Sequence, residues 1–362
     1  MPGNSTTITQ NAYNYLLPFR HASLLWLTFL IFLSPVTTAN DNTTPRNSTS
    51  ISLPTTATRY APIDIASYNK KLISDANYPE DSANDTATHH LWPVHTVYPK
   101  PGALLPFNRI VAYYGNFYSH RMGVLGQYPP DQMLAMLQNE AAKWQAADPA
   151  TSVVPAIEYI AVSAQKDPGS DGMYRNRMPT SQIDEAIELA KKVAGIVILD
   201  IQIGRSNVQA EVEHLASYLA MPNVHLALDP EFSMKGDKTP GKFIGTMDAT
   251  DINEVTHYLA DIVYKNNLPP KILIVHRFTE RMVTDRRDIK PLPEVQIVMD
   301  MDGWGSKGKK VSAYQDFIFA EPVQFTGFKL FYINDRKAPS TGLLTPAEIL
   351  KLKPQPLFIM YQ

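Results

Sequence analysis

The stretch NVHLALDPEF, residues 223–232, is an apolar run that ends in two carboxylates, Asp229 and Glu231, with a proline between them. Side chains alternate between the faces of a strand, so both carboxylates would share a face with His225 and Ala227, opposite a wholly apolar face. Carboxyl groups held close together raise each other's pKa, so one can stay protonated as a general acid while another stays ionised. The stretch therefore predicts acid–base chemistry, and the plain structural alternative is a strand that ends in a polar turn.

Other apolar runs of the chain carry polar residues on one face in the same way, most of them late in the run. The residues expected to point with Asp229 and Glu231 into a common interior are Tyr114, Glu158, Asp200, Gln202, His276, Asp300, Asp302 and Lys329. Burying so many carboxylates with one histidine and one lysine would be costly without a function. We expect Glu231, Asp229 and Asp302 to be catalytic, and the others to bind substrate together with Trp304.

The rhythm of the chain predicts the elements that hold these residues. Strand-like runs lie at 109–115, 153–162, 195–204, 224–232, 271–278, 295–303, 325–333 and 356–362. Amphipathic helical patterns with proline or Ser/Thr starts lie between them at 129–148, 180–195, 248–267 and 345–353. Strands that alternate with helices over about 255 residues predict the α/β class and a (β/α)8 TIM barrel whose last helix is absent. A doubly wound open sheet is the alternative.

The joints between the elements agree with a barrel. Connections from helix to strand are tight, whereas the segments after the strands at 165–179, 233–243 and 303–310 are long and polar. Barrel enzymes carry their sites on the loops that follow the strands. The segment 303–310, GWGSKGKK, is expected to be a flexible, solvated loop in which Trp304 offers a ring for stacking on a sugar.

The beginning of the chain resembles an export signal. Arg20 and His21 precede an apolar segment, 22–33, and small residues follow at 37–39. The apolar segment is shorter than the roughly 20 residues of a membrane-spanning helix. The expected organisation is a signal peptide (or N-terminal anchor) at 1–39, a flexible linker and extended arm at 40–107, and the barrel at 108–362. This predicts a secreted or periplasmic protein with no stable membrane span after signal removal.

Composition excludes several classes of function. The formal net charge of -2 argues against a nucleic-acid partner, which needs a basic face. The absence of cysteine excludes disulfides, thiolate metal sites and a cysteine nucleophile. The chain has no H-x-H or H-E-x-x-H spacing, so zinc is poorly supported. We expect no cofactor, and the sequence does not indicate an oligomeric state.

Three short motifs carry a family resemblance. The residues DPE at 229–231 resemble the end of the chitinase-type glycosidase motif D-x-x-D-x-D-x-E, and MDMDGWG at 299–305 resembles its sixth-strand M-x-Y-D. AYYGN at 112–116 resembles the tyrosine-bearing first strand. The resemblance implies a glycoside-hydrolase-like barrel with a carbohydrate substrate, Glu231 as catalytic acid, and Asp229 and Asp302 as its partners. Val224 and Ala227 stand where the motif has aspartates, and the last strand lacks its tryptophan.

Three functions follow from these patterns. The leading hypothesis is an exported glycosidase-like hydrolase that acts on a polysaccharide by carboxylate acid–base catalysis. The second is a metal-dependent hydrolase, because hard divalent cations favour oxygen ligands such as those of Asp200, Asp229, Glu231 and Asp300, with His276 beside them. The third is a barrel that binds a glycan or a partner without catalysis, which the motif departures favour.

Overall fold

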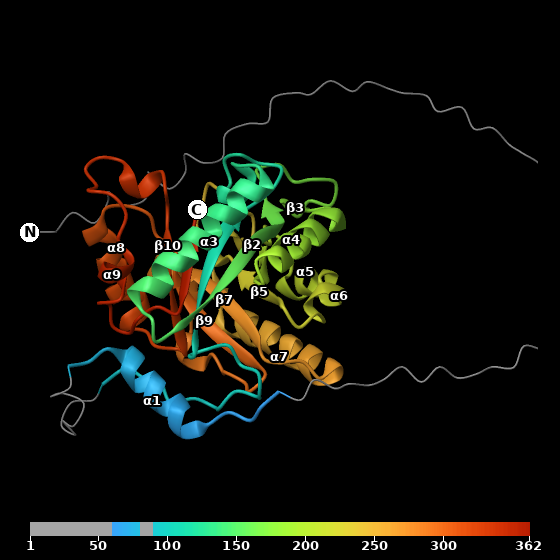
Figure 1. Ribbon diagram of the computed structural model, residues 1–362. Coiled ribbons are helices and arrows are strands. Elements are labelled where there is room, and N and C mark those ends of the chain that lie inside the picture. Colours follow the sequence, from blue (N-terminus) through green and yellow to red (C-terminus); the bar gives the residue numbers. More distant parts are fainter. Residues whose placement is uncertain (1–59, 80–89) are drawn as a thin grey trace, which may run out of the picture.

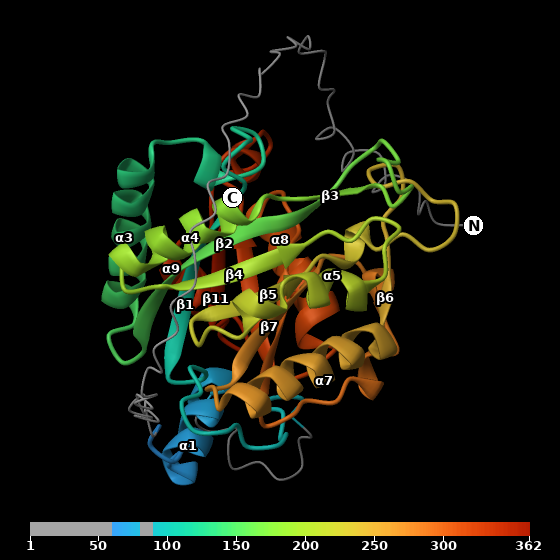
Figure 2. The ribbon, with the colours of Figure 1, turned by 90° about the vertical axis from the view of Figure 1, so that its right-hand side faces the viewer.

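Eight parallel strands close into a barrel in the computed structural model, which describes residues 60–79 and 90–362. The strands are β1 (Asn108–Gly115), β2 (Ser152–Ala164), β4 (Ile196–Ile201), β5 (Val224–Leu228), β7 (Lys271–Arg277), β9 (Val295–Met301), β10 (Phe325–Leu330) and β11 (Phe358–Tyr361). Strand β1 pairs with both β2 and β11, so the sheet has no free edge around the barrel (Figures 1 and 2). The predicted TIM barrel is confirmed, and the open sheet is excluded.

Helices cover the outside of the barrel (Figures 1 and 2). They are α3 (Pro130–Ala147), α4 (Thr180–Lys192), α5 (Val208–His214), α6 (Ala216–Leu219), α7 (Ala249–Asn266), α8 (Lys307–Tyr314) and α9 (Pro346–Ile349). Helix α7 begins with a capping box. The Asp248 side chain accepts hydrogen bonds from the backbone N–H groups of Thr250 and Asp251, and the Asp251 side chain accepts one from the backbone N–H of Asp248. The four predicted helical patterns correspond to α3, α4, α7 and α9.

Alternation along the strands separates two apolar layers. On β4, Val197, Leu199 and Ile201 pack outward with the helices, whereas Ile196 and Ile198 pack inside the barrel. Both layers are buried, which explains why the strand sequences read as nearly continuous apolar runs. Asp200 lies between the outward residues Leu199 and Ile201 and therefore points inward. The alternation predicted from the sequence is thus observed on β4.

Tyr361 lies in the outer layer. Its hydroxyl accepts a hydrogen bond from Trp144 Nε1 on α3 at 2.9 Å, and its ring stacks on that of Tyr332. Strand β11 therefore contributes no polar side chain of this kind to the interior.

The segment before β1 closes the amino-terminal end of the barrel. It was expected to be an extended arm, but it contains helix α1 (Ile65–Ala76), which begins at the cap residue Asp64 and lies beneath the barrel (Figure 1). Tyr68 of α1 and Leu105 belong to the same buried cluster as the inward-facing strand residues. The Gln296 side chain on β9 binds the backbone of Leu105 at both its N–H and its C=O. The segment before β1 is thus held against the barrel by apolar packing and by hydrogen bonds.

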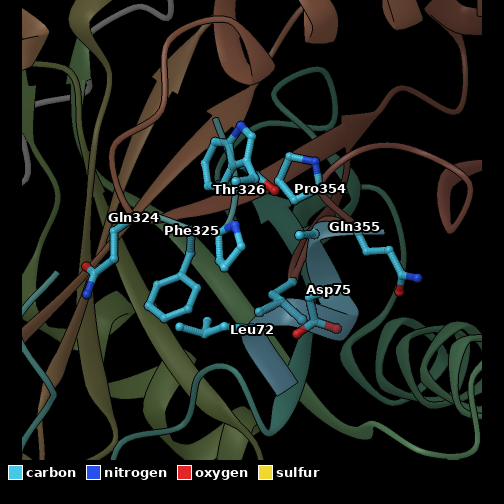
Figure 3. Close-up of a pocket in the computed structure, with 11 residues that line it drawn as sticks. Leu72, Asp75, Gln324, Phe325, Thr326, Pro354 and Gln355 are labelled. Atoms are coloured by element: carbon cyan, nitrogen blue, oxygen red, sulfur yellow. The ribbon is translucent and has the colours of Figure 1, made fainter. Parts of the chain in front are cut away.

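A small void remains between α1 and the barrel (Figure 3). Its volume is about 20 Å³, close to that of one water molecule, and Leu72, Asp75, Trp92 and Phe325 contribute to its walls. Asp75 is 5% exposed and one of its oxygens has no hydrogen-bond partner among the described residues.

The predicted export signal, 1–39, lies outside the described residues, as does the first part of the predicted linker, 40–59. Among residues 60–79 and 90–362, no helix has the length and apolar character needed to cross a membrane. The boundaries between signal, linker and arm stay predictions.

Candidate active site

A histidine of β7 joins two carboxylates that come from different strands of the barrel. His276 Nε2 lies 3.1 Å from Glu158 Oε1, and His276 Nδ1 lies 3.0 Å from Asp300 Oδ2. Asp300 is on the neighbouring strand β9, but Glu158 is on β2, which is separated from β7 by β4 and β5. The contact between His276 and Glu158 therefore crosses the lumen, which confirms that the polar side chains point inward.

The ring of His276 is held as a cation. Burial alone would lower the pKa of His276, but its hydrogen bonds with Asp300 and Glu158 outweigh burial and hold the pKa well above its ordinary value. The ring then donates from both nitrogens, one to each carboxylate. Burial raises the pKa of Glu158 and of Asp300, and the His276 cation opposes both shifts.

The three carboxylates expected to be catalytic meet above this layer. One oxygen from each of Asp229, Glu231 and Asp302 lies within 4.8 Å of the others. Asp302 directly follows β9, and its Oδ1 forms an ion pair with Lys329 Nζ on β10 at 2.8 Å. Residues from three different strands thus converge at the carboxyl end of the barrel.

Local backbone structure explains the position of Glu231. The predicted strand 224–232 ends early, at Leu228, and Pro230–Phe232 form a single 3-10 turn. Proline has no N–H for the sheet ladder, so the strand cannot continue through Pro230. Strand alternation therefore does not determine the direction of the Glu231 side chain. The turn nevertheless brings Glu231 beside Asp229 at the carboxyl end of the barrel. Asp229 is 1% exposed, whereas Glu231 is partly exposed.

Two polar side chains support Asp229 from below. Gln202 Nε2 donates to Asp229 Oδ2 at 3.2 Å and lies 3.1 Å from the hydroxyl of Tyr114, while its Oε1 accepts from the backbone N–H of Ala164. The Lys329 ammonium lies 4.1 Å from the centre of the Tyr114 ring. Tyr114, Gln202 and Lys329 therefore link β1, the end of β4 and β10 to the carboxylates.

Electrostatics separate the protonation states of the carboxylates. Burial, followed by repulsion from Asp229 and Asp302, raises the pKa of Glu231 well above its ordinary value. Burial and Asp302 also raise the pKa of Asp229, but His276 and Lys329 oppose them, and the result is about 6. Burial and the neighbouring carboxylates thus favour the protonated form of Glu231. Asp229, whose pKa is about 6, is mostly ionised at pH 7.

Asp200 is the most poorly compensated acid of the interior. It is fully buried on β4, and neither of its oxygens accepts a hydrogen bond of good geometry from the described residues. Burial and the nearby Asp229 raise the pKa of Asp200 well above its ordinary value. A neutral Asp200 avoids the large cost of an unpaired buried charge.

Trp304 is the predicted site residue that stands apart. It is partly exposed on the segment after β9, with Lys309 Nζ 5.6 Å from the centre of its ring. None of the hydrogen bonds, ion pairs or ring contacts of the described residues joins it to the three carboxylates. Trp304 follows Asp302 by two residues in the sequence. Its role in stacking on a sugar stays a prediction.

Lys310 is a buried residue that the sequence did not reveal. The segment 303–310, expected to be a flexible loop, enters helix α8 at Lys307 and buries Lys310. Its ammonium donates to the carbonyls of Gly303 and Lys329 and pairs with Asp335 at 2.8 Å. Lys310 therefore fixes the segment after Asp302 against the end of β10. Its spacing on an amphipathic pattern with Tyr314 is the signal that could have identified a helix.

The carboxylates that could hold a metal ion already have a cation beside them. The hypothesis of a metal site used Asp200 and His276, but both ring nitrogens of His276 are engaged by carboxylates. The group with suitable spacing is Asp229, Glu231 and Asp302, and there the Lys329 ammonium already lies against Asp302. A divalent cation would compete with this resident positive charge.

Comparisons with known proteins give architectural likenesses at low similarity. No family profile and no curated protein matches the sequence. A xyloglucan-specific endo-β-1,4-glucanase of glycoside hydrolase family 5 from a metagenomic library, solved with cellotriose, shares 11% identity at a TM-score of 0.36, over 65% of this chain and 78% of its own. The cellulose synthase subunit Z of Clostridioides difficile shares 9% sequence identity at a TM-score of 0.40, over 71% of this chain and 91% of its own. A Bacillus subtilis mannanase shares 11% sequence identity at a TM-score of 0.37, over 74% of this chain and 88% of its own. The barrel is defined here by its own strand pairing, and these likenesses assign no activity.

Proposed function

We propose that the protein is a glycan-cleaving hydrolase of the barrel class, with Glu231 as general acid and Asp229 as the ionised carboxylate. The observation that supports this most is the meeting of Asp229, Glu231 and Asp302, with one oxygen of each within 4.8 Å of the others. Burial and the neighbouring carboxylates raise the pKa of Glu231 well above its ordinary value, while the pKa of Asp229 is about 6. Glycoside hydrolysis needs one protonated and one ionised carboxyl group at the scissile bond.

The remaining polar residues have supporting roles in this proposal. Asp302, paired with Lys329, completes the carboxylate set and raises the pKa of Glu231 and of Asp229 after burial. Tyr114, Gln202 and Lys329 orient Asp229 and present donors to sugar hydroxyls. Glu158, His276, Asp300 and Asp200 form the layer beneath, which excludes water and sets the charge felt by the catalytic carboxyls.

Export is part of the proposal. The pattern of 1–39 suits a cleavable signal, and a polysaccharide substrate would be met outside the cytoplasm. Amino-terminal sequencing of the mature protein from its native host tests this. A new amino terminus near residue 40 is expected, and a mature chain that begins at Met1 would contradict it.

The test of the activity is the release of reducing ends from a panel of β-glucans, mannans, xylans and chitin. Glu231→Gln keeps the size of the side chain but removes the acid, so activity should fall by about 10²- to 10⁴-fold. Glu254→Gln, at an exposed position of α7, is the matched control and should retain full activity. Hydrolysis that survives Glu231→Gln unchanged would overturn the assignment.

A barrel that binds a glycan without cleaving it is the second candidate, and the motif departures at Val224 and Ala227 favour it. Its signature is saturable binding to a polysaccharide of the panel by a wild-type protein that releases no reducing ends.

A further inference from the structure

A second hollow lies on the outer wall of the barrel, between α3 and the segment that follows β10. Its volume is about 400 Å³, within the range of small-molecule sites. The walls include Tyr128, Met136, Asn139, Tyr332, Ile333 and Arg336. None of these residues belongs to the carboxylate site.

Strand β1 contributes one side chain to the hollow and the next one to the interior of the barrel. Tyr113 of β1 faces outward and lines the hollow, whereas its neighbour Tyr114 faces inward toward Lys329. The hydroxyls of Tyr113 and Tyr332 lie 3.1 Å apart, and the Tyr332 ring stacks on Tyr361 at 5.2 Å. Part of the wall of the hollow is therefore formed by two hydrogen-bonded tyrosines, the buried Tyr113 and the partly exposed Tyr332.

The rim combines exposed apolar surface with polar side chains. Tyr128 is 37% exposed and Ile333 is 63% exposed, which is a large exposed fraction for side chains of this kind. Asn139 and Arg336 are exposed, and their planar amide and guanidinium groups can bind hydroxyls in pairs. Lys143 and Glu140 neutralise each other at 2.7 Å. The hollow thus offers apolar faces and hydrogen-bonding groups, and the charge of Arg336 is the one among its lining residues that Lys143 and Glu140 do not cancel.

This combination fits one class of ligand. A pyranose ring has an apolar face, which packs on aromatic and aliphatic side chains, and hydroxyl groups at its edge, which need planar polar partners. The apolar surface of Tyr128, Tyr332 and Ile333 favours a ligand with an apolar face over a small ion such as phosphate. We propose that the hollow is a second binding site, specific for neutral saccharide chains, that holds a polysaccharide while the carboxylate site works on it.

The proposal takes its ligand class from the proposed function, but its binding test does not depend on catalysis. The experiment measures stoichiometry by calorimetry with cellohexaose, mannohexaose and xylohexaose, using full-length Glu231→Gln protein to prevent turnover. Asn139→Trp fills the hollow from an exposed helical position, and Gln138→Trp, an exposed neighbour on α3 that does not line the hollow, is the matched control.

The expected result is two bound oligosaccharides per chain in Glu231→Gln and in its combination with Gln138→Trp, and one fewer in its combination with Asn139→Trp. Tyr128→Ala should weaken the affected site at least tenfold. A stoichiometry that Asn139→Trp leaves unchanged would overturn the proposal, as would absence of binding to all three sugars. If only the proposed hydrolase function is wrong, Glu231→Gln protein should bind one oligosaccharide, in the hollow, and its combination with Asn139→Trp should bind none.

Discussion

At the scale of residues, the site consists of six inward or mouth-facing carboxyl groups and two cations. The acids are Glu158, Asp200, Asp229, Glu231, Asp300 and Asp302, and the cations are His276 and Lys329. Full ionisation would leave a large uncompensated negative charge in a buried volume, which is too costly to maintain. The raised pKa values of Glu231 and Asp200 reduce this excess of negative charge, because they favour the neutral form of each acid. Burial is the first cause of both shifts.

The pH dependence of the reaction should report Asp229. Because burial raises its pKa to about 6, the reactive carboxylate is lost as pH falls through about 6, and kcat/KM should drop about tenfold per pH unit below that value. Gln202→Ala removes a hydrogen bond that lowers the pKa of Asp229, so the acid limb should move to higher pH. A limb near pH 4, where an ordinary aspartate titrates, would contradict this account.

The spacing of the carboxyl groups predicts the stereochemistry. Oxygens of Asp229, Glu231 and Asp302 lie within 4.8 Å of one another, close to the separation of about 5 Å of retaining glycosidases and short of the 6.5–9.5 Å of inverting ones. We expect retention of configuration, read from the first-formed anomer by proton NMR. An inverted first product would show that the working pair of carboxyls is a different one.

At the scale of elements, each strand end delivers its polar residue to a common layer, and small residues leave the necessary space. Gly327 on β10 faces Asp300 on β9. A Cβ at Gly327 would lie 2.5 Å from Asp300 Oδ1 and 2.9 Å from the Phe358 ring. The absence of a side chain at Gly327 is therefore what allows Asp300 to stand beside His276.

Gly327→Ala should displace Asp300 and destabilise the barrel by about 1–3 kcal/mol, the usual cost of overpacking a core. Thermal unfolding measures the loss. Gly308→Ala on α8 is the control, because its Cβ would meet no atom within 4 Å and alanine favours a helix. An unchanged melting temperature in Gly327→Ala would show that the barrel accommodates the methyl group.

The sequence predicted these elements unevenly, for physical reasons. Strand periodicity identified β4 and β9 and the inward facing of Asp200 and Asp300, because alternation is a local property. The contact between His276 and Glu158 depends on closure of the barrel, which no local pattern contains. The turn at Pro230 was predicted as strand, because the alternation of polar and apolar residues continues through Asp229 and Glu231. Helix α8 was missed because the two glycines and lysines around Lys307 resemble a loop.

At the scale of the whole molecule, the carboxyl end of the barrel carries the proposed chemistry and the opposite end is closed by α1. Tyr68 and Leu105 join the interior cluster, and the backbone N–H of Gln355 donates to the carbonyl of Asp75. Asp75 is paired with Lys71, yet burial raises its pKa to about 6. The closure of the barrel is therefore linked to pH.

The sign of that linkage follows from the raised pKa. The stability that Asp75 contributes is fully present below its unfolded pKa, near 3.9, and is lost as pH rises through about 6. Asp75→Asn should therefore increase the free energy of unfolding by about 1–3 kcal/mol at pH 7, with no gain at pH 4. Asp261→Asn, on the exposed side of α7, should change neither value. A gain of equal size at both pH values would exclude this linkage.

The protonation of Glu231 is the claim on which the proposed chemistry depends, and it can be measured without a substrate. Titration of the carboxyl carbons by ¹³C NMR, with the Glu231 signal assigned by its loss in Glu231→Gln, gives its pKa directly. Because burial and the neighbouring Asp229 and Asp302 hold the pKa of Glu231 well above its ordinary value, the midpoint of its titration should lie well above that of an ordinary glutamate. A midpoint near 4.3, the value of an unperturbed glutamate, would contradict the account.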